Sequence, residues 1–122
     1  MGNFYVDCEI VNVRSAKKTA KVSHLLVDTG SECSWISQEV LKPIGVKVEK
    51  KDMVFQMANG KTITRSIGYA ILRAEGFETI DEVVFAEPGD LQLLGARTLE
   101  GFGALVDSRK KKLIAAGPIP AA

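Results

Sequence analysis

One short stretch of the chain, LLVDTGS at residues 25–31, decides how the rest of the sequence is interpreted. Three apolar residues lead directly into Asp28, so a carboxylate stands at the end of an otherwise apolar strand. Such a carboxylate is costly unless hydrogen bonds or a charged partner compensate it. Thr29, Gly30 and Ser31 supply small polar groups and close backbone approach. The stretch is therefore either an Asx-type turn that ends a strand or a loop that carries a catalytic carboxylate.

The composition is that of one ordinary globular domain, which we assign to residues 1–122. The chain is 46% hydrophobic and 25% charged, with a formal net charge of +1. This length suits a single domain. The balanced charge gives no overall attraction for nucleic acid or for an anionic membrane, and the basic run at residues 109–112 is interpreted as a solvated hairpin turn. We expect neither nucleic acid nor a membrane as a partner.

The sequence also favours a cytoplasmic location. No apolar stretch approaches the ~20 residues that span a bilayer, and the N-terminal residues lack the pattern of a signal peptide. Cys8 and Cys33 are too few for a disulfide framework and do not have metal-ligand spacing, so a reducing compartment is expected. No metal and no cofactor are expected.

A catalytic pair of the Cys–His or Ser–His type would need His24, because it is the only histidine. Its position in the middle of a predicted strand favours a half-buried structural residue. Glycine-rich phosphate loops are absent from the sequence. Asp28 is therefore the strongest candidate for chemistry.

Alternation of apolar and polar residues dominates the chain and predicts a mostly-β fold. A polar turn is expected over residues 14–18. Two short helices are expected over residues 38–44, with Ser37 as N-cap, and over residues 96–102. Strands are expected over residues 3–13, 19–27, 34–36, 46–57, 61–74, 77–86, 91–94, 104–107 and 113–115. The predicted architecture is a closed or partly closed β-barrel with one or two short helices.

The clearest hairpin signal is Asn59-Gly60, because both residues tolerate the positive φ angles of a type I′ turn. It lies about thirty residues after Asp28. A second apolar-apolar-glycine segment, at residues 93–95, precedes the last predicted helix. The Asp28 loop, this hairpin and the apolar-apolar-glycine segment follow one another in this order, and the order resembles that of a known protein family.

The sequence resembles the retropepsin-like aspartic protease family over nearly the whole chain. That family has a hydrophobic-hydrophobic-Asp-Thr-Gly loop, a flap hairpin, and then hydrophobic-hydrophobic-Gly followed by a helix. The chain is most similar to small stand-alone prokaryotic predicted aspartyl proteases. In those proteins an Ala-Asn-Gly turn, a Pro-Gly-Asp loop, Leu-Leu-Gly, a Leu-Glu-x-x-Gly helix and Val-Asp recur, and they correspond here to residues 58–60, 88–90, 93–95, 99–103 and 106–107.

The resemblance implies an aspartic endopeptidase that acts as a symmetric homodimer. Such enzymes hold one water between two carboxylates that share a proton, because two close carboxylates cannot both ionise. This chain has one Asp-Thr-Gly, so the second Asp28 must come from a second copy across a two-fold axis. The expected substrate is a peptide or an unfolded protein, cleaved between largely apolar residues. The alternative is a non-catalytic dimeric peptide-binding module of the same fold.

The resemblance also implies roles for the residues of the loop. Asp28 is the catalytic carboxylate, Thr29 braces the two loops of the dimer, and Gly30 lets the substrate backbone approach. Ser31 is expected to donate a hydrogen bond to the Asp28 carboxylate and to favour a more acidic optimum. Glu32 is expected to contact the substrate backbone.

Two further regions are expected to contact substrate. Trp35 and Leu93 are expected to line side-chain pockets, with membership of the plain core as the alternative. Ala58, Asn59 and Gly60 form the expected flap tip, which has a single glycine. The flap is expected to be mobile and to close over bound peptide.

The sequence departs from the retroviral pattern at the last helix. It begins Gly95-Ala96-Arg97 where retroviral enzymes have Gly-Arg-Asn. Whether Arg97 braces the catalytic loop through a carboxylate stays open at this point. The retroviral dimer uses both chain ends, and how the proline-rich end of this chain would pair also stays open.

Overall fold

The computed structural model describes residues 3–121 and is mostly β, as predicted. Within this range there are two short helices, α1 (Gln38–Leu41) and α2 (Ala96–Phe102). The strands are β1 (Tyr5–Asn12), β2 (Ser15–Val27), β3 (Ser34–Ser37), β4 (Lys50–Gln56), β5 (Thr62–Ala74), β6 (Phe77–Ala86), β7 (Leu93–Leu94), β8 (Ala104–Asp107) and β9 (Lys112–Ala115).

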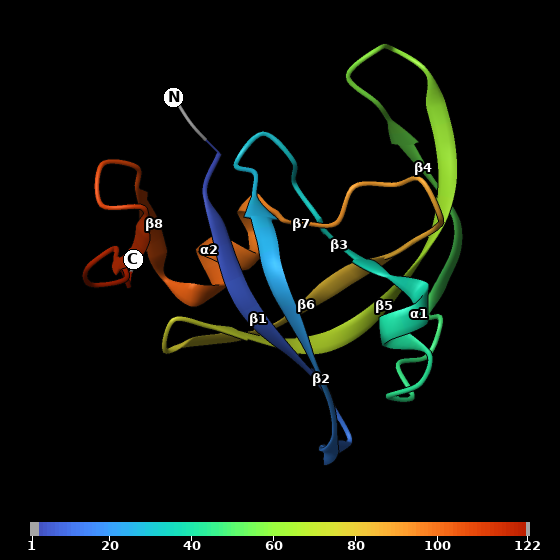
Figure 1. Cartoon of the computed structure of the whole chain (residues 1–122), viewed down its shortest axis with the longest axis horizontal. Helices are drawn as coiled ribbons and strands as arrows, with labels where there is room; N and C mark the ends of the chain where they lie inside the picture. Colours follow the sequence, from blue (N-terminus) through green and yellow to red (C-terminus); the bar gives the residue numbers. More distant parts are fainter. Residues whose placement is uncertain (1–2, 122) are drawn as a thin grey trace.

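Seven of the strands form one sheet that returns on itself. Their order is β1-β2-β7-β3-β6-β5-β4, and β1 also pairs with β5 at Glu9↔Arg73, Ile10↔Leu72 and Val11↔Ile71. Six strands therefore make a ring of hydrogen-bonded neighbours, and β4 extends beyond it. Figure 1 shows the β4–β5 hairpin projecting from the ring on one side and the separate β8–β9 hairpin on the other.

The core lies inside this ring because the strands alternate. On β1, Val6, Cys8 and Ile10 are buried, whereas Tyr5 and Asp7 are exposed. Helix α2 adds Leu99 and Phe102 to the same apolar cluster. Burial of apolar surface of this kind is the main stabilising contribution to folding. A second, smaller cluster lies outside the main one and consists of Trp35, Ile67, Val84, Ala86 and Leu93.

The end of β2 is fixed by a parallel pairing with β7. Leu26 lies opposite Leu93 and Val27 opposite Leu94. The backbone N–H of Asp28 then donates to the carbonyl of Leu94 at 2.9 Å. The sequence segments 26–28 and 93–94 are thus held side by side, and Asp28 is placed where this pairing stops.

The first hairpin is tighter than expected. β2 begins at Ser15 instead of residue 19, so the predicted turn over residues 14–18 is wrong. The Asn12 side-chain oxygen accepts from the backbone N–H groups of Arg14 and Ser15 at 2.8 and 3.2 Å. These bonds close the turn within two residues and let the polar run continue as a strand.

The first helix is shorter than expected. Ser37 is its N-cap as predicted, and its hydroxyl accepts from the Glu39 N–H at 3.1 Å. The helix ends at Leu41 instead of residue 44, two residues before Pro43. Lys42 still has helical backbone angles, but Pro43 has no N–H to donate to the next helical carbonyl, which accounts for the early end. Helix α2 and the hairpin turn around the basic run have the predicted positions.

Two predicted strands begin too early. β4 starts at Lys50 instead of residue 46, because Val46 turns inward and joins the core. The strand also contains a bulge, at which Asp52 has a φ of 53°. β7 contains only Leu93 and Leu94, whereas Leu91 is 70% exposed.

The turn at residues 57–60, between β4 and β5, differs from the expected type I′ geometry. Gly60 has a φ of 84°, but Asn59 is not among the described residues with positive φ. The Gly60 N–H donates to Met57 O at 2.9 Å, and the Met57 N–H donates to Lys61 O at 2.8 Å. This is the pattern of a type I turn followed by a left-handed glycine. Only the glycine needs the left-handed region.

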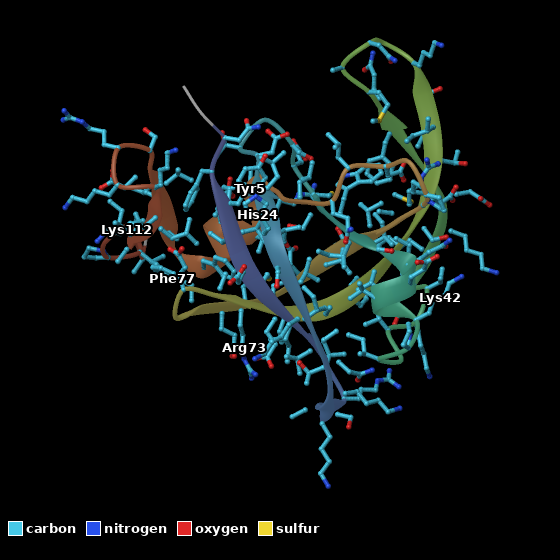
Figure 2. The ribbon with its side chains drawn as sticks, in the orientation of Figure 1. Tyr5, His24, Lys42, Arg73, Phe77 and Lys112 are labelled. Carbon is cyan, nitrogen blue, oxygen red and sulfur yellow. The ribbon has the colours of Figure 1, made fainter. Side chains whose placement is uncertain are left out.

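His24 is exposed instead of half-buried, so the prediction for this residue is wrong. It lies at an irregularity in the β1–β2 pairing and has a φ of 59°. Its N–H donates to Asp7 Oδ1 at 3.0 Å. Its ring stacks on Tyr5 with centroids 3.9 Å apart, at the upper ends of β1 and β2 in Figure 2.

Within the described residues, no helix is long and apolar enough to cross a membrane. The predicted cytoplasmic location stays a prediction.

Gly95, at the start of α2, packs directly against the backbone of the loop after Asp28. A Cβ atom on Gly95 would lie 2.4 Å from the carbonyl oxygen of Cys33 and 2.8 Å from that of Glu32. Its φ of −95° suits any residue, so glycine is required here by space and not by backbone conformation. The helix and the loop can approach this closely only because the side chain is absent.

We predict that Gly95→Ala lowers the free energy of unfolding by ~3 kcal/mol, since backbone atoms would have to move apart. Thermal and urea unfolding followed by circular dichroism measure the loss. Glu100→Ala, an exposed change in the same helix, is the control. A Gly95→Ala protein as stable as the Glu100→Ala protein would contradict the required contact.

Candidate active site

A groove of about 620 Å³ runs past Asp28. Three segments form it: the loop that follows β2, the β4 arm of the β4–β5 hairpin, and the segment that leads into β7. In Figure 1 these segments face one another in the upper half of the molecule. The residues that line the groove are Asp28, Gly30, Ser31, Glu32, Cys33, Trp35, Val54, Phe55, Gln56, Met57, Ala58, Gly89, Asp90, Leu91 and Leu93.

The Asp28 side chain is held by its own loop. Its Oδ1 accepts from the backbone N–H of Gly30 at 2.9 Å, and its carbonyl accepts from the Ser31 N–H at 3.2 Å. A Cβ on Gly30 would lie 3.2 Å from that same Oδ1. Glycine therefore leaves room for the carboxylate as well as for an approaching ligand. The residue is half-buried, so the carboxylate is anchored and still reaches the groove.

The expected hydrogen bond from Ser31 to Asp28 is not made. The Ser31 hydroxyl donates to the backbone carbonyl of Cys33 at 3.1 Å. A hydroxyl has one proton to donate, and the turn geometry directs it along the loop. Ser31 therefore stabilises the loop through Cys33 instead of donating to the Asp28 carboxylate.

The start of helix α2 binds the loop through its backbone. The Ala96 N–H donates to Ser31 O at 2.7 Å, and the Arg97 N–H donates to Glu32 O at 3.0 Å. The first N–H groups of a helix have no partner within the helix, so the loop carbonyls satisfy them. These bonds and the Gly95 contact fix the loop that carries Asp28.

A buried chain of hydrogen bonds strengthens the same junction. The Gly95 N–H donates to Ser34 Oγ at 2.9 Å, Ser34 Oγ and Thr98 Oγ1 are 2.6 Å apart, and the Thr98 hydroxyl donates to Asp81 Oδ2 at 2.8 Å. Because a carboxylate accepts hydrogen bonds, the Thr98 hydroxyl donates to Asp81, and the Ser34 hydroxyl therefore donates to Thr98. All the bonds therefore run in one direction and reinforce one another.

Arg97 does contact a carboxylate of the loop. Its Nη2 lies 3.3 Å from Glu32 Oε2, and its Nη1 lies 3.1 Å from Glu82 Oε1 on β6. Arg97 thus contacts the Asp28 loop through a carboxylate, a point that the sequence left open. The Glu32 side chain is 78% exposed, so this pair contributes little to stability, but it directs Glu32 along the rim of the groove.

The walls of the groove are largely apolar. Trp35 and Leu93 both lie in the smaller apolar cluster, and Trp35 meets the edge of Phe55 with ring centroids 5.1 Å apart. Sequence analysis missed Phe55, Met57 and Leu91 as lining residues. The sequence held no clear signal for them, because all residues from Val54 to Ala58 line the groove and Leu91 lies outside β7.

The structure brings seven of the ten predicted site residues to the groove. These are Asp28, Gly30, Ser31, Glu32, Trp35, Ala58 and Leu93. The other three, Thr29, Asn59 and Gly60, are exposed and lie outside its lining.

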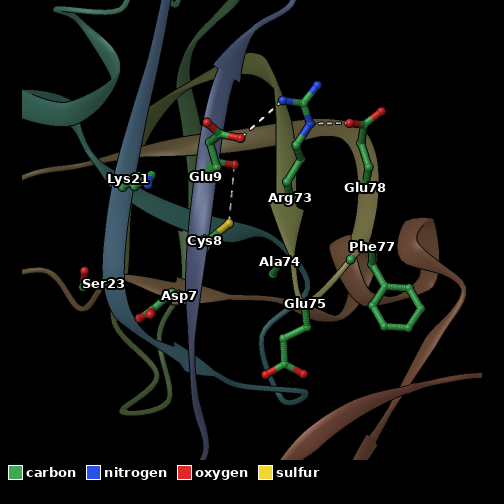
Figure 3. A pocket seen from close by; sticks show the side chains of 11 residues that line it. Asp7, Cys8, Glu9, Lys21, Ser23, Arg73, Ala74, Glu75, Phe77 and Glu78 are labelled. Carbon is green, nitrogen blue, oxygen red and sulfur yellow. Dashed lines mark hydrogen bonds and ion pairs between the residues drawn. The ribbon is translucent and has the colours of Figure 1, made fainter.

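Burial disfavours the thiolate form of both cysteines. Cys33 lines the groove, but burial raises the pKa of its thiol and favours the protonated form. A second concavity of about 590 Å³ lies between β1 and the β5–β6 turn, where Arg73 bridges Glu9 and Glu78 (Figure 3). At its floor, burial raises the pKa of the Cys8 thiol to about 12.

Comparison with known proteins gives matches to one family model and to solved structures. The family model described as "gag-polyprotein putative aspartyl protease" matches residues 15–101. Among solved structures, the retroviral protease-like domain of Ddi1 from Leishmania major matches with a TM-score of 0.56 and 18% sequence identity. That match covers 94% of this chain and 89% of the other.

The comparison with curated proteins found no match. The family match nevertheless spans most of the chain, and it includes the Asp28 loop, the β4–β5 hairpin and nearly all of α2. The structural match extends the likeness of fold to almost the full length. The chain belongs to the retropepsin-like family of gag-polyprotein-type aspartyl proteases.

Proposed function

We propose that this protein is an aspartic endopeptidase whose active site forms when two copies bring their Asp28 carboxylates together. One observation carries the proposal: Asp28 reaches an apolar groove of peptide-binding size, on a loop fixed from behind by helix α2. Membership of the retropepsin-like family supports it. The role of Asp28 as the catalytic carboxylate is part of the proposal.

The acids along the groove support the need for a second copy. Besides Asp28, the described lining contains only Glu32 and Asp90 as acidic residues. Glu32 pairs with Arg97, and Asp90 forms a two-bond ion pair with Arg65. Both carboxylates are thus engaged by guanidinium groups, and the Arg65 guanidinium lowers the pKa of Asp90. We therefore propose the other Asp28 as the second member of the dyad.

The proposed chemistry follows from two equivalent carboxylates at short distance. Their mutual repulsion leaves one proton between them. The ionised carboxylate takes a proton from the attacking water, while the protonated one donates a hydrogen bond to the scissile carbonyl. The N–H of Gly30 holds Oδ1 of its Asp28, so each carboxylate keeps its orientation as the proton moves. Thr29, exposed beside the carboxylate, is in position to contact the partner loop.

The proposed substrate is a peptide or an unfolded segment in extended form. Trp35, Phe55 and Leu93 give the groove apolar walls, which suit apolar side chains on either side of the cleaved bond. The flap at residues 58–60 is proposed to close over the bound chain. The second candidate function, a dimeric peptide-binding module without turnover, fits the same groove and is separated by the first experiment below.

The β8–β9 hairpin is a candidate dimer surface. It forms its own two-stranded sheet, and Leu105 and Ile114 lie opposite each other on its outer face. They are 54% and 38% exposed. A two-stranded hairpin is marginal alone, and an exposed apolar pair on it favours burial against another surface.

The first prediction concerns the carboxylate. Asp28→Asn should lower kcat on an unfolded protein or a peptide library by at least ~10³-fold, because an amide cannot share the proton. The variant should keep its fold, since the amide oxygen can still accept from the Gly30 N–H. Asp7→Asn, an exposed change outside the groove, is the matched control. Equal turnover by the Asp28→Asn protein would refute the catalytic role, and peptide binding without turnover by the wild type would establish the binding module.

The second prediction concerns assembly. Analytical ultracentrifugation should show a dimer at micromolar concentration, and Leu105→Lys should weaken it at least ~10-fold, because a charge would be buried at the contact. Ile80→Lys, a change of the same type on β6 at a side chain that is 66% exposed, should leave the dimer intact. Full activity in a protein that stays monomeric would rule out the shared site.

The third prediction concerns the flap. Gly60→Val should lower kcat/KM ~10-fold, since a β-branched residue is strained at a φ of 84°. No atom lies within 4 Å of the added Cβ, so the effect is one of backbone conformation alone. Gly60→Asn should retain more activity, because asparagine tolerates this region. Equal kcat/KM for the two variants would show that the turn geometry is not required.

A further inference from the structure

Two walls of the groove are joined by ion pairs of Arg65, of which the pair with Asp90 is the shorter. Arg65 lies on β5, three residues beyond its first residue, Thr62, and opposite Met53 on the other arm of the flap hairpin. Its Nε and Nη2 donate to the two carboxylate oxygens of Asp90 at 2.7 and 2.8 Å. Asp90 belongs to the loop that leads into β7 and itself lines the groove. The pair thus connects the flap-bearing strand to the opposite segment.

The geometry of this pair makes it stronger than an ordinary surface contact. The two side chains are only 15% and 13% exposed. Parallel two-bond contacts between guanidinium and carboxylate are directional, and solvent screens them weakly at this exposure. The Arg65 guanidinium holds the pKa of Asp90 below its usual value. Glu87 is the other charged group near Arg65, at 3.8 Å.

Asp90 also fixes the shape of its own loop. Its Oδ2 accepts from the Glu87 N–H at 2.8 Å, and its N–H donates to Glu87 O at 2.9 Å. The residues between form a closed turn in which Gly89 has a φ of 93°. Leu91 follows directly and lines the groove. A displacement of Asp90 therefore displaces the turn and the Leu91 wall together.

We propose that Arg65 and Asp90 are a positioning pair, which ties the 87–91 loop to the flap-bearing strand so that both walls of the groove move as one unit around bound peptide. The kinetic consequence of this inference rests on the proposed function. Loss of the pair leaves each wall free to move alone. The binding-competent arrangement is then less populated, and the apparent affinity for peptide falls in proportion.

Hydrogen exchange of the free protein tests the coupling directly. Arg65→Met and Asp90→Asn should each speed amide exchange about tenfold in both residues 53–61 and residues 87–91, as local opening requires. Asparagine keeps an oxygen for the Glu87 N–H, so the turn itself survives. The double variant should exchange no faster than either single variant, because both changes remove the same contact.

The matched control lies on the same strand. Arg73→Met removes an arginine of β5 that pairs with Glu9 and Glu78 at the other end of the molecule and is 43% exposed (Figures 2 and 3). It should change exchange in the two segments by less than twofold. Faster exchange in only one segment, additive effects in the double variant, or the same response to Arg73→Met would each overturn the proposal.

Kinetics separate positioning from a merely structural role. On a peptide substrate, Arg65→Met should raise KM about tenfold and change kcat by less than twofold, because the chemistry at Asp28 is untouched once peptide is bound. An unchanged KM in an active enzyme would overturn the proposal. If the wild-type protein turns over no peptide, the proposed function fails, and the exchange experiment alone decides whether the pair couples the two walls.

Discussion

The structure depends on one close contact, between Gly95 at the start of α2 and the backbone of the loop that follows Asp28. The absence of a side chain at residue 95 lets the first helical N–H groups reach the carbonyls of Ser31 and Glu32. That approach satisfies donors that a helix start always leaves free, and it does so with the loop that carries the carboxylate. A strand end, a tight loop and a short helix thereby become one rigid unit, although each would be marginal alone.

The two sides of the groove differ in how they are held. On the side of Asp28, backbone bonds, the parallel β2–β7 pairing and the buried chain from Gly95 to Asp81 fix the position. On the opposite side, β4 is the last strand of the sheet, and nearly all its residues are exposed. Segments with few buried contacts open at low free-energy cost. Under the proposed function, the loop on one side keeps Asp28 in place. The exposed β4 strand on the other side can open to admit an extended peptide.

The sequence predicted most of what depends on local pattern. Alternation located the strands, glycine and proline located most of the turns, and the order of motifs predicted the family. The errors arose where a tertiary contact outweighed the local signal: Asn12 closed a turn in two residues, Val46 entered the core, and the Ser31 hydroxyl turned to Cys33. The Arg65–Asp90 pair could not be predicted, because 25 positions separate its members and no pattern in one sequence reports such a pairing.

Charge places a final constraint on how this fold can perform chemistry. A carboxylate beside apolar walls gains reactivity only if a partner controls its proton, and the other acids of the groove are committed to guanidinium groups. Both Glu32 and Asp90 are engaged by arginine side chains, which hold the walls of the groove in place. In our proposal these two acids serve geometry, and Asp28 carries the chemistry. Under the proposed function, a symmetric partner supplies the missing carboxylate, because symmetry gives both groups the same environment and one proton is then shared equally between them.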